Sequence, residues 1–277
     1  MADVVDRPAP DAVLLDVRWT LAGGSDLPGY LAGHLPGALF LDLDADLAAP
    51  AHGTPGAGRH PLPDPAELQA TLRRLGLSAD STVVVYDAID GTAAVRAWWV
   101  LRWAGLADVA VLEGGLSAWT GPLETGQAPP PPPGTVVVTP GGMPTMDADR
   151  AAAAPVLLDA RAAARYRGEV EPMDPVAGHI PGARNLPYGD LYVDGRLRPV
   201  PELRQAFAAV GLRPGESGVA SCGSGVSAGH LVLAARAAGI ELALYPGSYS
   251  GWCSLGRPVV TGDRPDVSAG PAGAGGR

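Results

Sequence analysis

The sequence predicts an α/β protein of two tandem domains, each a parallel sheet flanked by helices on both faces. Short apolar runs alternate with segments of helical pattern along both halves of the chain. Two motifs recur in the same order: Val-Leu-Leu-Asp begins at positions 13 and 156, and Gly-His-[Leu/Ile]-Pro-Gly-Ala begins at positions 33 and 178. A chain of 277 residues is long enough for two such units, each with its own core.

The repeat also predicts where the domains begin and end. Five successive prolines follow Gln127 and Ala128, and such a run forms an extended linker. We therefore expect a first domain over residues 1–126, a linker over 127–139 and a second domain over 140–263. The tail, 264–277, is rich in Gly, Ala and Pro, and we expect it to be disordered.

The expected elements occur in the same order in both halves. The strands are short apolar runs, at residues 13–17, 82–86 and 109–112 and again at 156–160, 218–221 and 242–245. The helices have an apolar face, at residues 65–75 and 92–104 and again at 201–210 and 226–238. In such sheets, ligands bind beyond the carboxyl ends of the strands, and Cys222 lies directly after one of them.

Cys222 is the first residue of the turn Cys-Gly-Ser-Gly-Val-Ser, which joins a predicted strand to a predicted helix. Such a turn aims several backbone N–H groups at one point, and the positive end of the helix adds to their effect. We predict that these groups stabilise Cys222 as a thiolate, the nucleophilic form of cysteine. The alternative is that Cys222 is a small buried apolar residue. The flanking glycines favour the reactive role.

The first half has a carboxylate where the second has this thiol. The register that pairs Glu67 with Glu202 also pairs Asp87 with Cys222. Because a carboxylate cannot carry sulfur as a thiolate does, we expect the first domain to be catalytically silent. It would contribute packing or one wall of the cleft.

Composition limits which partners the protein is expected to bind and where in the cell it is expected to occur. The net charge of −9 and the pI near 4.9 argue against nucleic acid and against an anionic membrane. No apolar run reaches the roughly 18 residues of a membrane span, and the N-terminus lacks the core of a signal peptide, so we expect a cytoplasmic protein. In that reducing compartment Cys222 would be a lone reactive thiol, with Cys253 structural or incidental.

These motifs, in this order, resemble the tandem rhodanese-type sulfurtransferases over almost the whole chain. The resemblance rests on Asp-x-Arg after the first strand of each half, on Gly-His-[Leu/Ile]-Pro-Gly-Ala, on Gly-Gly-Leu-Ser-Ala-Trp at 114–119 and on the Cys-headed loop. The loop is similar to that of the 3-mercaptopyruvate sulfurtransferases. Thiosulfate sulfurtransferases carry basic residues where Gly223 and Ser224 stand here.

The resemblance implies that Cys222 takes a sulfur atom from a small anionic donor and holds it as a persulfide. The expected donor is 3-mercaptopyruvate, with thiosulfate as the alternative. The acceptor would be a thiol or cyanide, with a thioredoxin-like protein among the candidates, and no cofactor is needed. Backbone N–H groups of the loop would stabilise the persulfide anion, namely those of Gly223, Gly225, Val226 and Ser227.

Arg165 matches the family arginine that binds the donor anion, and a guanidinium suits a carboxylate. The family has a second arginine where this chain has Met173, so we expect one of the two anion contacts to be missing. Arg161 belongs to the repeated Asp-x-Arg motif. Because Arg18 is its counterpart in the first half, a structural ion pair is the favoured interpretation for Arg161.

The resemblance also implies a Ser-His-Asp relay that moves protons as the product leaves. By motif position, its members would be Ser224, His34 and Asp26. His34 has a counterpart in His179, in the same repeated motif. A turn-stabilising role is therefore an equal alternative for His34 and the favoured one for His179.

The sequence also bears on three other classes of function. Most Cys-dependent phosphatases need an arginine six residues after the nucleophile, and here that residue is Ala228. A dinucleotide-binding role would need Gly-x-Gly-x-x-Gly after an early strand, and this pattern is missing there. A non-catalytic persulfide carrier or binding module remains an alternative, which Arg165 disfavours.

Overall fold

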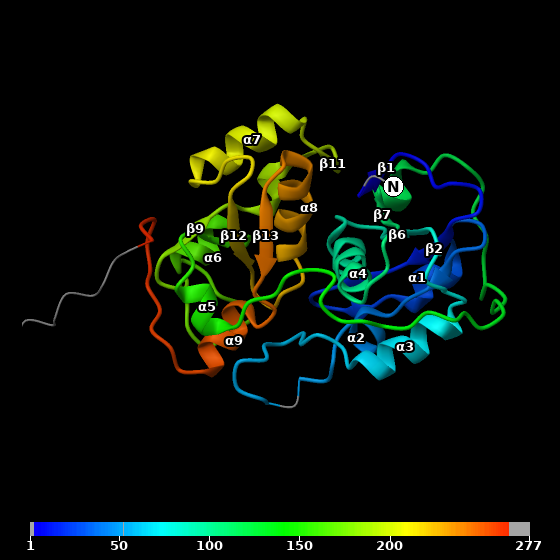
Figure 1. The fold of residues 1–277 in the computed structure, drawn as a ribbon, viewed down its shortest axis with the longest axis horizontal. Coiled ribbons are helices and arrows are strands. Elements are labelled where there is room, and N and C mark those ends of the chain that lie inside the picture. Colours follow the sequence, from blue (N-terminus) through cyan, green and yellow to red (C-terminus); the bar gives the residue numbers. More distant parts are fainter. Residues whose placement is uncertain (1–2, 52, 266–277) are drawn as a thin grey trace, which may run out of the picture.

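The computed structural model describes residues 3–51 and 53–265 of the chain. It contains two parallel sheets, each with its own helices, and these two units lie side by side in Figure 1. Most of the tail expected to be disordered, from residue 266 on, lies outside the described residues. Within the described residues, no helix is long and apolar enough to cross a membrane.

The first unit is built on a five-stranded sheet in the order β1-β7-β6-β2-β5. Its strands are β1 (Val4–Val5), β2 (Val13–Asp16), β5 (Leu39–Phe40), β6 (Val83–Tyr86) and β7 (Val109–Leu112). Its helices are α1 (Leu27–Ala32), α2 (Leu43–Asp46), α3 (Pro65–Arg74), α4 (Thr92–Trp103) and the 3-10 turn η1 (Gly115–Ala118). A small antiparallel hairpin joins β3 (Trp19–Thr20) to β4 (Gly24–Ser25).

The second unit is built on a four-stranded sheet in the order β13-β12-β8-β9. Its strands are β8 (Leu157–Asp159), β9 (Ala183–Asn185), β12 (Ser217–Ser221) and β13 (Glu241–Leu244). Its helices are α5 (Ala148–Ala152), α6 (Ala163–Arg167), the 3-10 turn η2 (Tyr188–Leu191), α7 (Val200–Ala209), α8 (Ala228–Ala238) and α9 (Ser248–Ser254). A hairpin joins β10 (Tyr192–Val193) to β11 (Arg196–Leu197).

Every strand pairing within the two main sheets is parallel, which confirms the predicted fold class. The central strand β6 reads Val-Val-Val-Tyr and is buried along its whole length, as expected of a parallel strand covered on both faces. Asp64 precedes helix α3 and its side chain caps two backbone N–H groups, and Pro65 is the first helical residue. The local sequence therefore sets both the strand and the helix start.

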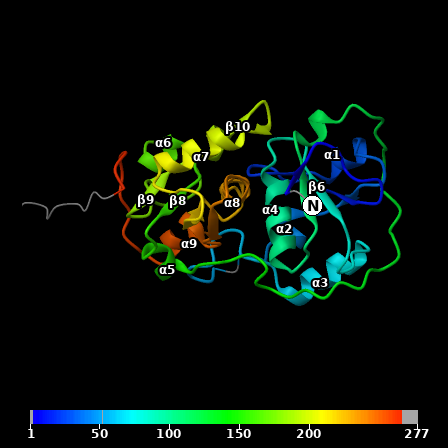
Figure 2. The same cartoon turned by 45° about the horizontal axis from the view of Figure 1, so that its top comes forward.

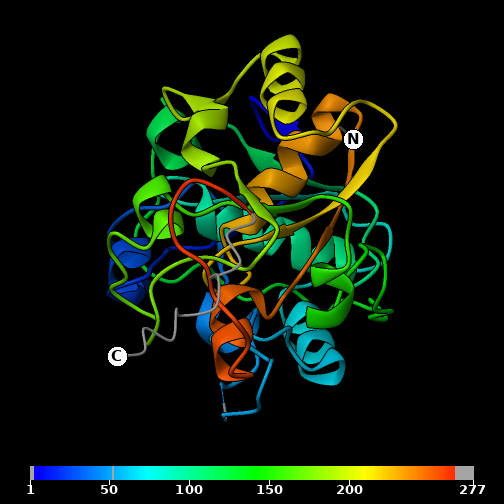
Figure 3. The same ribbon diagram turned by 90° about the vertical axis from the view of Figure 1, so that its left-hand side faces the viewer.

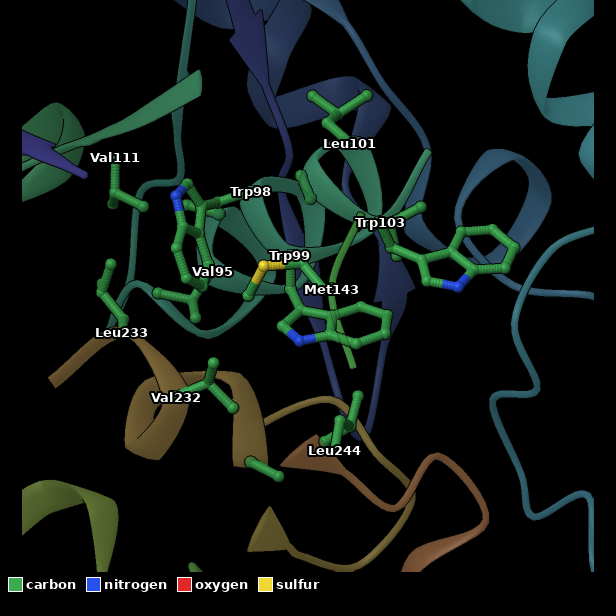
Figure 4. Close-up of a cluster of buried hydrophobic side chains, with 14 of the residues drawn as sticks. Val95, Trp98, Trp99, Leu101, Trp103, Val111, Met143, Val232, Leu233 and Leu244 are labelled. Atoms are coloured by element: carbon green, nitrogen blue, oxygen red, sulfur yellow. The ribbon is translucent and has the colours of Figure 1, made fainter. Parts of the chain in front are cut away.

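One hydrophobic cluster joins the two units. It includes Trp98 and Trp99 of α4 as well as Val232 and Leu233 of α8, all of them buried. Figure 4 shows these side chains meeting between the two helices, with Met143 beside them. Since large aromatic side chains dominate the energetics of such contacts, this shared core fixes how the units lie against each other.

Two further segments cross between the units. The hairpin β10–β11 reaches from the second unit toward the first (Figure 2). Arg196 Nη1 of this hairpin lies 2.7 Å from Glu113 Oε2 of the first unit. Residues 127–139 contain neither helix nor strand and run along the first unit, where Val136 N donates to Leu77 O at 3.0 Å. Figure 3, seen from the end of the second unit, shows that unit in front of the first.

Candidate active site

Cys222 lies at a cavity of about 330 Å³ that both units line. It follows β12, an interior strand of the second sheet, and its side chain is buried. The second unit contributes the Cys222 loop and two arginines, and the first unit closes the other side. Residues of the first unit on this cavity are Trp19, Thr20, Leu21, Arg59, Ile89, Asp90 and Thr92.

The loop after Cys222 presents backbone donors to an anion. Gly225 N donates to Cys222 Sγ at 3.1 Å. Among the described residues, no acceptor is found for the N–H groups of Gly223, Ser224, Val226 and Ser227, so these donors are available to a ligand. The chain turns at Gly225, whose φ is +79° and where a Cβ would lie 2.4 Å from Pro246 O. The loop is therefore close-packed.

Ser248, the first residue of α9, contacts both the backbone and the sulfur of Cys222. Its hydroxyl oxygen accepts from Cys222 N at 3.1 Å, donates to Tyr245 O at 2.8 Å and lies 4.0 Å from Cys222 Sγ. Ser248 has a φ of +50°, a conformation that costs a non-glycine residue about 1 kcal/mol or more. The first repeat has Gly115 at this position, with a φ of +56°. The two hydrogen bonds offset the strain of the serine.

In the first unit, the equivalent loop is filled by its own carboxylate. Asp87 Oδ1 accepts from Ile89 N and Gly91 N, both at 3.0 Å. Asp87 Oδ2 accepts from Ala93 N at 3.1 Å and from Ala94 N at 3.3 Å. Burial raises the pKa of the Asp87 carboxyl, and the backbone donors oppose that shift. The donors that an anionic ligand would use are therefore already occupied.

The loop serine meets a histidine that sequence reasoning did not select. Ser224 Oγ lies 2.8 Å from His60 Nδ1, and His60 Nε2 lies 3.7 Å from Asp44 Oδ1. Asp44 Oδ1 also accepts from Trp19 Nε1 at 2.9 Å, which fixes the carboxylate. Burial and the charges of Arg96 and Arg59 lower the pKa of His60 to about 4. His60 is therefore neutral near pH 7, as a general base must be.

The relay expected through His34 and Asp26 is wrong. His34 Nδ1 lies 3.0 Å from Tyr30 O, and its ring stacks on Tyr30 at 4.1 Å. His179 repeats this arrangement with Tyr166, at 2.8 Å and 3.7 Å. Asp26 caps α1 by accepting from Gly29 N. Both histidines of the repeated motif therefore stabilise a turn.

Arg165, on α6, lines the cavity as the sequence suggested. Its Nη2 donates to Glu171 Oε1 at 2.6 Å, and its Nε donates to Glu171 Oε2 at 3.3 Å. Burial acts to raise the pKa of Glu171, but Arg165 and the N–H groups of Met173 and Asp174 lower it below its ordinary value. A charged Glu171 therefore orients Arg165 toward the cavity.

Arg161 forms the structural ion pair that its repeat counterpart predicted. Its Nε and Nη2 donate hydrogen bonds to the Asp159 carboxylate at distances from 2.7 to 3.1 Å. Arg18 donates to Asp16 through the same two nitrogen atoms. Arg161 Nη1 also lies 3.2 Å from Glu171 Oε2. Its three nitrogen atoms therefore donate to acceptors within its own unit, which are the carboxylates of Asp159 and Glu171 and the carbonyl oxygen of Gly178.

Arg96, on α4, fastens the loop to the first unit. It is buried, and its Nη1 donates to Gly225 O at 3.1 Å. Its Nη2 donates to the carbonyl oxygens of Leu47, His60 and Pro61 at 2.9 to 3.2 Å. Burial lowers the pKa of Arg96 to about 10, so the side chain remains a cation near pH 7. One cation thus connects the Cys222 loop with the His60 segment.

The residues that sequence reasoning missed share one signal, which is a difference between the two copies. The register that pairs Glu67 with Glu202 pairs His60 with Gly195 and Arg59 with Asp194. A side chain present in one copy alone is not needed for the shared fold. This asymmetry could have selected His60 and Arg59 ahead of His34.

No group of three or more His, Cys, Asp or Glu side chains in residues 3–51 and 53–265 is arranged to hold a metal ion. Cys222 and Cys253 are both free thiols. The chemistry available to the described residues is therefore that of a thiol, a neutral histidine with a serine, and several guanidinium groups.

The chain is similar to known proteins over most of its length. Residues 2–122 and 145–255 match the rhodanese-like domain. A probable 3-mercaptopyruvate sulfurtransferase of Pseudomonas aeruginosa is 46% identical over 272 residues, which cover 92% of this chain and 94% of that protein. A putative thiosulfate sulfurtransferase of Mycobacterium tuberculosis is 45% identical over 259 residues, which cover 90% of each.

A solved structure is also similar to this chain. The 3-mercaptopyruvate sulfurtransferase from Leishmania major superposes with a TM-score of 0.79 at 32% identity. The match covers 90% of this chain and 72% of that one. A match of this extent includes most of both sheets.

Proposed function

Because this chain belongs to the rhodanese-like family and is a sulfurtransferase, we propose that it carries sulfur as a persulfide on Cys222, with 3-mercaptopyruvate as its main donor. The observation that supports this donor is the contact between Ser224 and His60 beside Cys222. The loop supports the intermediate, since its free N–H groups suit an anionic terminal sulfur.

The proposed step transfers the donor's sulfur atom to Cys222 and conserves atoms and charge. The Cys222 thiolate attacks the thiol sulfur of the donor, a sulfur–sulfur bond forms, and the carbon–sulfur bond breaks. The electron pair of that bond passes to carbon and yields the enolate of pyruvate. The proton lost from the donor's thiol sulfur is taken up by the enolate, so the products are a persulfide anion and pyruvate.

Ser224, His60 and Asp44 would carry that proton. Asp44 lies on the Nε2 side of His60 and favours the tautomer with hydrogen there, which leaves Nδ1 to accept from the Ser224 hydroxyl. A neutral His60 can take a proton and return it through Ser224. Thiosulfate releases sulfite and has no carbon to protonate. A relay of this kind therefore favours mercaptopyruvate.

The acceptor would be a small thiol or cyanide, and a thioredoxin-like protein is a candidate for the physiological role. We place the reaction in the cytoplasm, where thiols are kept reduced. Arg165 would bind the donor carboxylate, as it lines the cavity and is oriented by Glu171.

The test compares mercaptopyruvate with thiosulfate as donors in steady-state assays. We expect a higher kcat/KM with mercaptopyruvate, and mass spectrometry should locate the persulfide on Cys222. Ser224→Ala should lower the turnover of mercaptopyruvate more than that of thiosulfate. A higher kcat/KM with thiosulfate would assign thiosulfate as the donor, and the lack of a persulfide on Cys222 would refute the mechanism.

A further inference from the structure

We propose that a groove beside the Cys222 cavity binds the sulfur acceptor, and that it selects a small thiol that carries a positive charge. This inference rests on the proposed function, because it names the class of acceptor that takes sulfur from the Cys222 persulfide. It concerns the second half of the reaction, in which the sulfur leaves the protein.

The acceptor groove is an open hollow of about 760 Å³ that adjoins the cavity of Cys222. The groove and the cavity share four lining residues, which are Ile89, Asp90, Ala162 and Tyr188. Cys222 itself is only 1% exposed, so an acceptor must reach its sulfur through the cavity. Because the shared residues form a common wall, a thiol bound in the groove can extend its sulfur toward Cys222.

Tyr188, the first residue of η2, is held firmly in this wall. Its ring stacks on His230 at 4.6 Å, and its backbone N donates to Ala160 O at 3.1 Å. Its hydroxyl donates to Asp90 Oδ2 at 3.0 Å. Asp90 belongs to the first unit and Tyr188 to the second, so this bond fixes the wall across the boundary between the units. A wall that is already ordered loses little conformational entropy when a ligand binds.

The arginines of the Cys222 cavity are balanced by carboxylates. Each of them forms an ion pair: Arg59 with Asp174, Arg161 with Asp159, and Arg165 with Glu171. None of these arginines lines the acceptor groove. His60, which is neutral near pH 7, adds no positive charge to the cavity.

The acceptor groove, in contrast, is lined by three aspartates that no cation balances. Asp90 accepts from Thr92 N and from the Tyr188 hydroxyl, which are uncharged donors. Asp190 and Asp194 are exposed, and within residues 3–51 and 53–265 neither carboxylate has a hydrogen bond or an ion pair. The described residues that line the groove include no Lys, Arg or His.

The charges on neighbouring elements do not offset these aspartates. Arg196 and Arg198 follow them in the chain, but they pair with Glu113 and Glu202 and do not line the groove. The groove therefore attracts an ammonium group and repels a carboxylate. Its other walls, such as Pro187 and Ala162, are apolar and suit the carbon chain of a small thiol.

In the transfer step, the thiolate of the acceptor attacks the terminal sulfur of the Cys222 persulfide. A bond forms between these two sulfur atoms, the bond from the terminal sulfur to Cys222 Sγ breaks, and Cys222 leaves as a thiolate. The acceptor departs as a persulfide anion, and no oxidant or reductant is consumed. An ammonium group on the acceptor also favours its thiolate form, since a nearby positive charge lowers the pKa of a thiol.

The test uses three thiols of similar size. Cysteamine, 2-mercaptoethanol and 3-mercaptopropionate carry an ammonium, a hydroxyl and a carboxylate group at the same end of a two-carbon chain. Cys222 is first converted to its persulfide with mercaptopyruvate, or with thiosulfate or polysulfide in its place, and mass spectrometry verifies the loading. The rate at which each thiol removes the sulfur is then measured in a single turnover at low ionic strength.

Two double variants are compared with the wild type. Asp190→Asn with Asp194→Asn removes two charges from the acceptor groove, and asparagine tolerates the φ of +50° at position 194. Asp11→Asn with Asp80→Asn is the matched control. It removes two charges at exposed positions that line neither the cavity nor the groove.

The measured quantity is the ratio of the cysteamine rate to the 3-mercaptopropionate rate. The intrinsic reactivity of each thiol is the same for every variant, so a change in this ratio reports the field of the protein. We expect the groove variant to slow cysteamine and to speed 3-mercaptopropionate, each by about two- to fivefold, so that the ratio falls by about four- to twenty-fivefold. The rate with 2-mercaptoethanol should change least, and about 1 M salt should remove most of the difference.

The control variant should keep the wild-type ratio. A ratio within about twofold of the wild type in the groove variant would overturn the inference, and so would an equal fall in the control. If mercaptopyruvate leaves Cys222 unmodified but thiosulfate or polysulfide loads it, the donor assignment fails and the acceptor comparison still decides for the groove. No persulfide on Cys222 from any of the three would refute the mechanism and this inference together.

Discussion

Asp87→Asn should destabilise the protein while leaving its turnover nearly intact. The Asp87 carboxylate takes two backbone N–H groups on each oxygen, at 3.0 to 3.3 Å. An asparagine keeps one oxygen and turns an NH2 group toward the other pair of donors. Two buried N–H groups then lack an acceptor, at about 1–3 kcal/mol each, or about 2–6 kcal/mol in total.

Burial raises the pKa of the Asp87 carboxyl, so removal of its charge also relieves a desolvation cost. This effect places the expected loss in the lower part of that range, at about 2–4 kcal/mol. Because Asp87 stands where the second copy has its thiol, kcat should stay within about threefold of the wild type.

Urea unfolding followed by tryptophan fluorescence measures the loss, and most of the tryptophans lie in the first unit. The matched control is Asp64→Asn. Asp64 Oδ1 alone caps Ala66 N and Glu67 N, and an asparagine oxygen can do the same, so stability should change by no more than about 0.5 kcal/mol. Equal stability of the two variants would refute the hydrogen-bond reasoning. A folded Asp87→Asn protein with kcat reduced by orders of magnitude would show that the first copy takes part in the chemistry.

The other predictions concern the chemistry. Cys222→Ser should abolish sulfur transfer and Cys253→Ser should retain it, as a hydroxyl cannot form a persulfide; a persulfide mapped to Cys253 would contradict this. His60→Asn should lower kcat for mercaptopyruvate by about 10²- to 10⁴-fold and affect thiosulfate far less, whereas equal losses would refute the relay. With its pKa lowered by burial to about 4, His60 stays neutral as pH falls through 6.5, so the ratio of kcat/KM between the wild type and His60→Asn should drop only near pH 4; a midpoint of this ratio near 6.5 would refute that assignment. Met173→Arg should leave KM within about twofold, and a tenfold fall would place that residue on the donor.

The sequence was sufficient for the parts of the molecule that local patterns determine. Hydrophobic runs such as that of β6 predicted parallel strands, and the strand-to-helix turn placed Cys222 beside backbone donors. The repeat predicted the ion pair of Arg161, since Arg18 stands in the same place. Each of these features depends on residues that are close together in the chain.

The relay could not be read in the same way, because its members meet only through the packing of the two units. Ser224 and His60 are 164 positions apart, and their contact depends on how α4 and α8 lie together. Motif position favoured His34, whose ring is occupied by Tyr30. Arg59 could not be identified from the sequence for the same reason, since its partner Asp174 belongs to the other unit.

The guanidinium of Arg96 bears on how such a gene can evolve. This buried cation of the first copy holds the carbonyl of Gly225, inside the loop of the second copy, together with the carbonyls of the segment that carries His60. The first copy has Asp87 in place of the cysteine, so a comparison of the two loops alone would suggest that this copy is spare. Here, removing it would take away His60 and Asp44, one wall of the pocket and the arginine that holds the loop of Cys222. The two copies therefore depend on each other, and selection acts on the pair as a single unit.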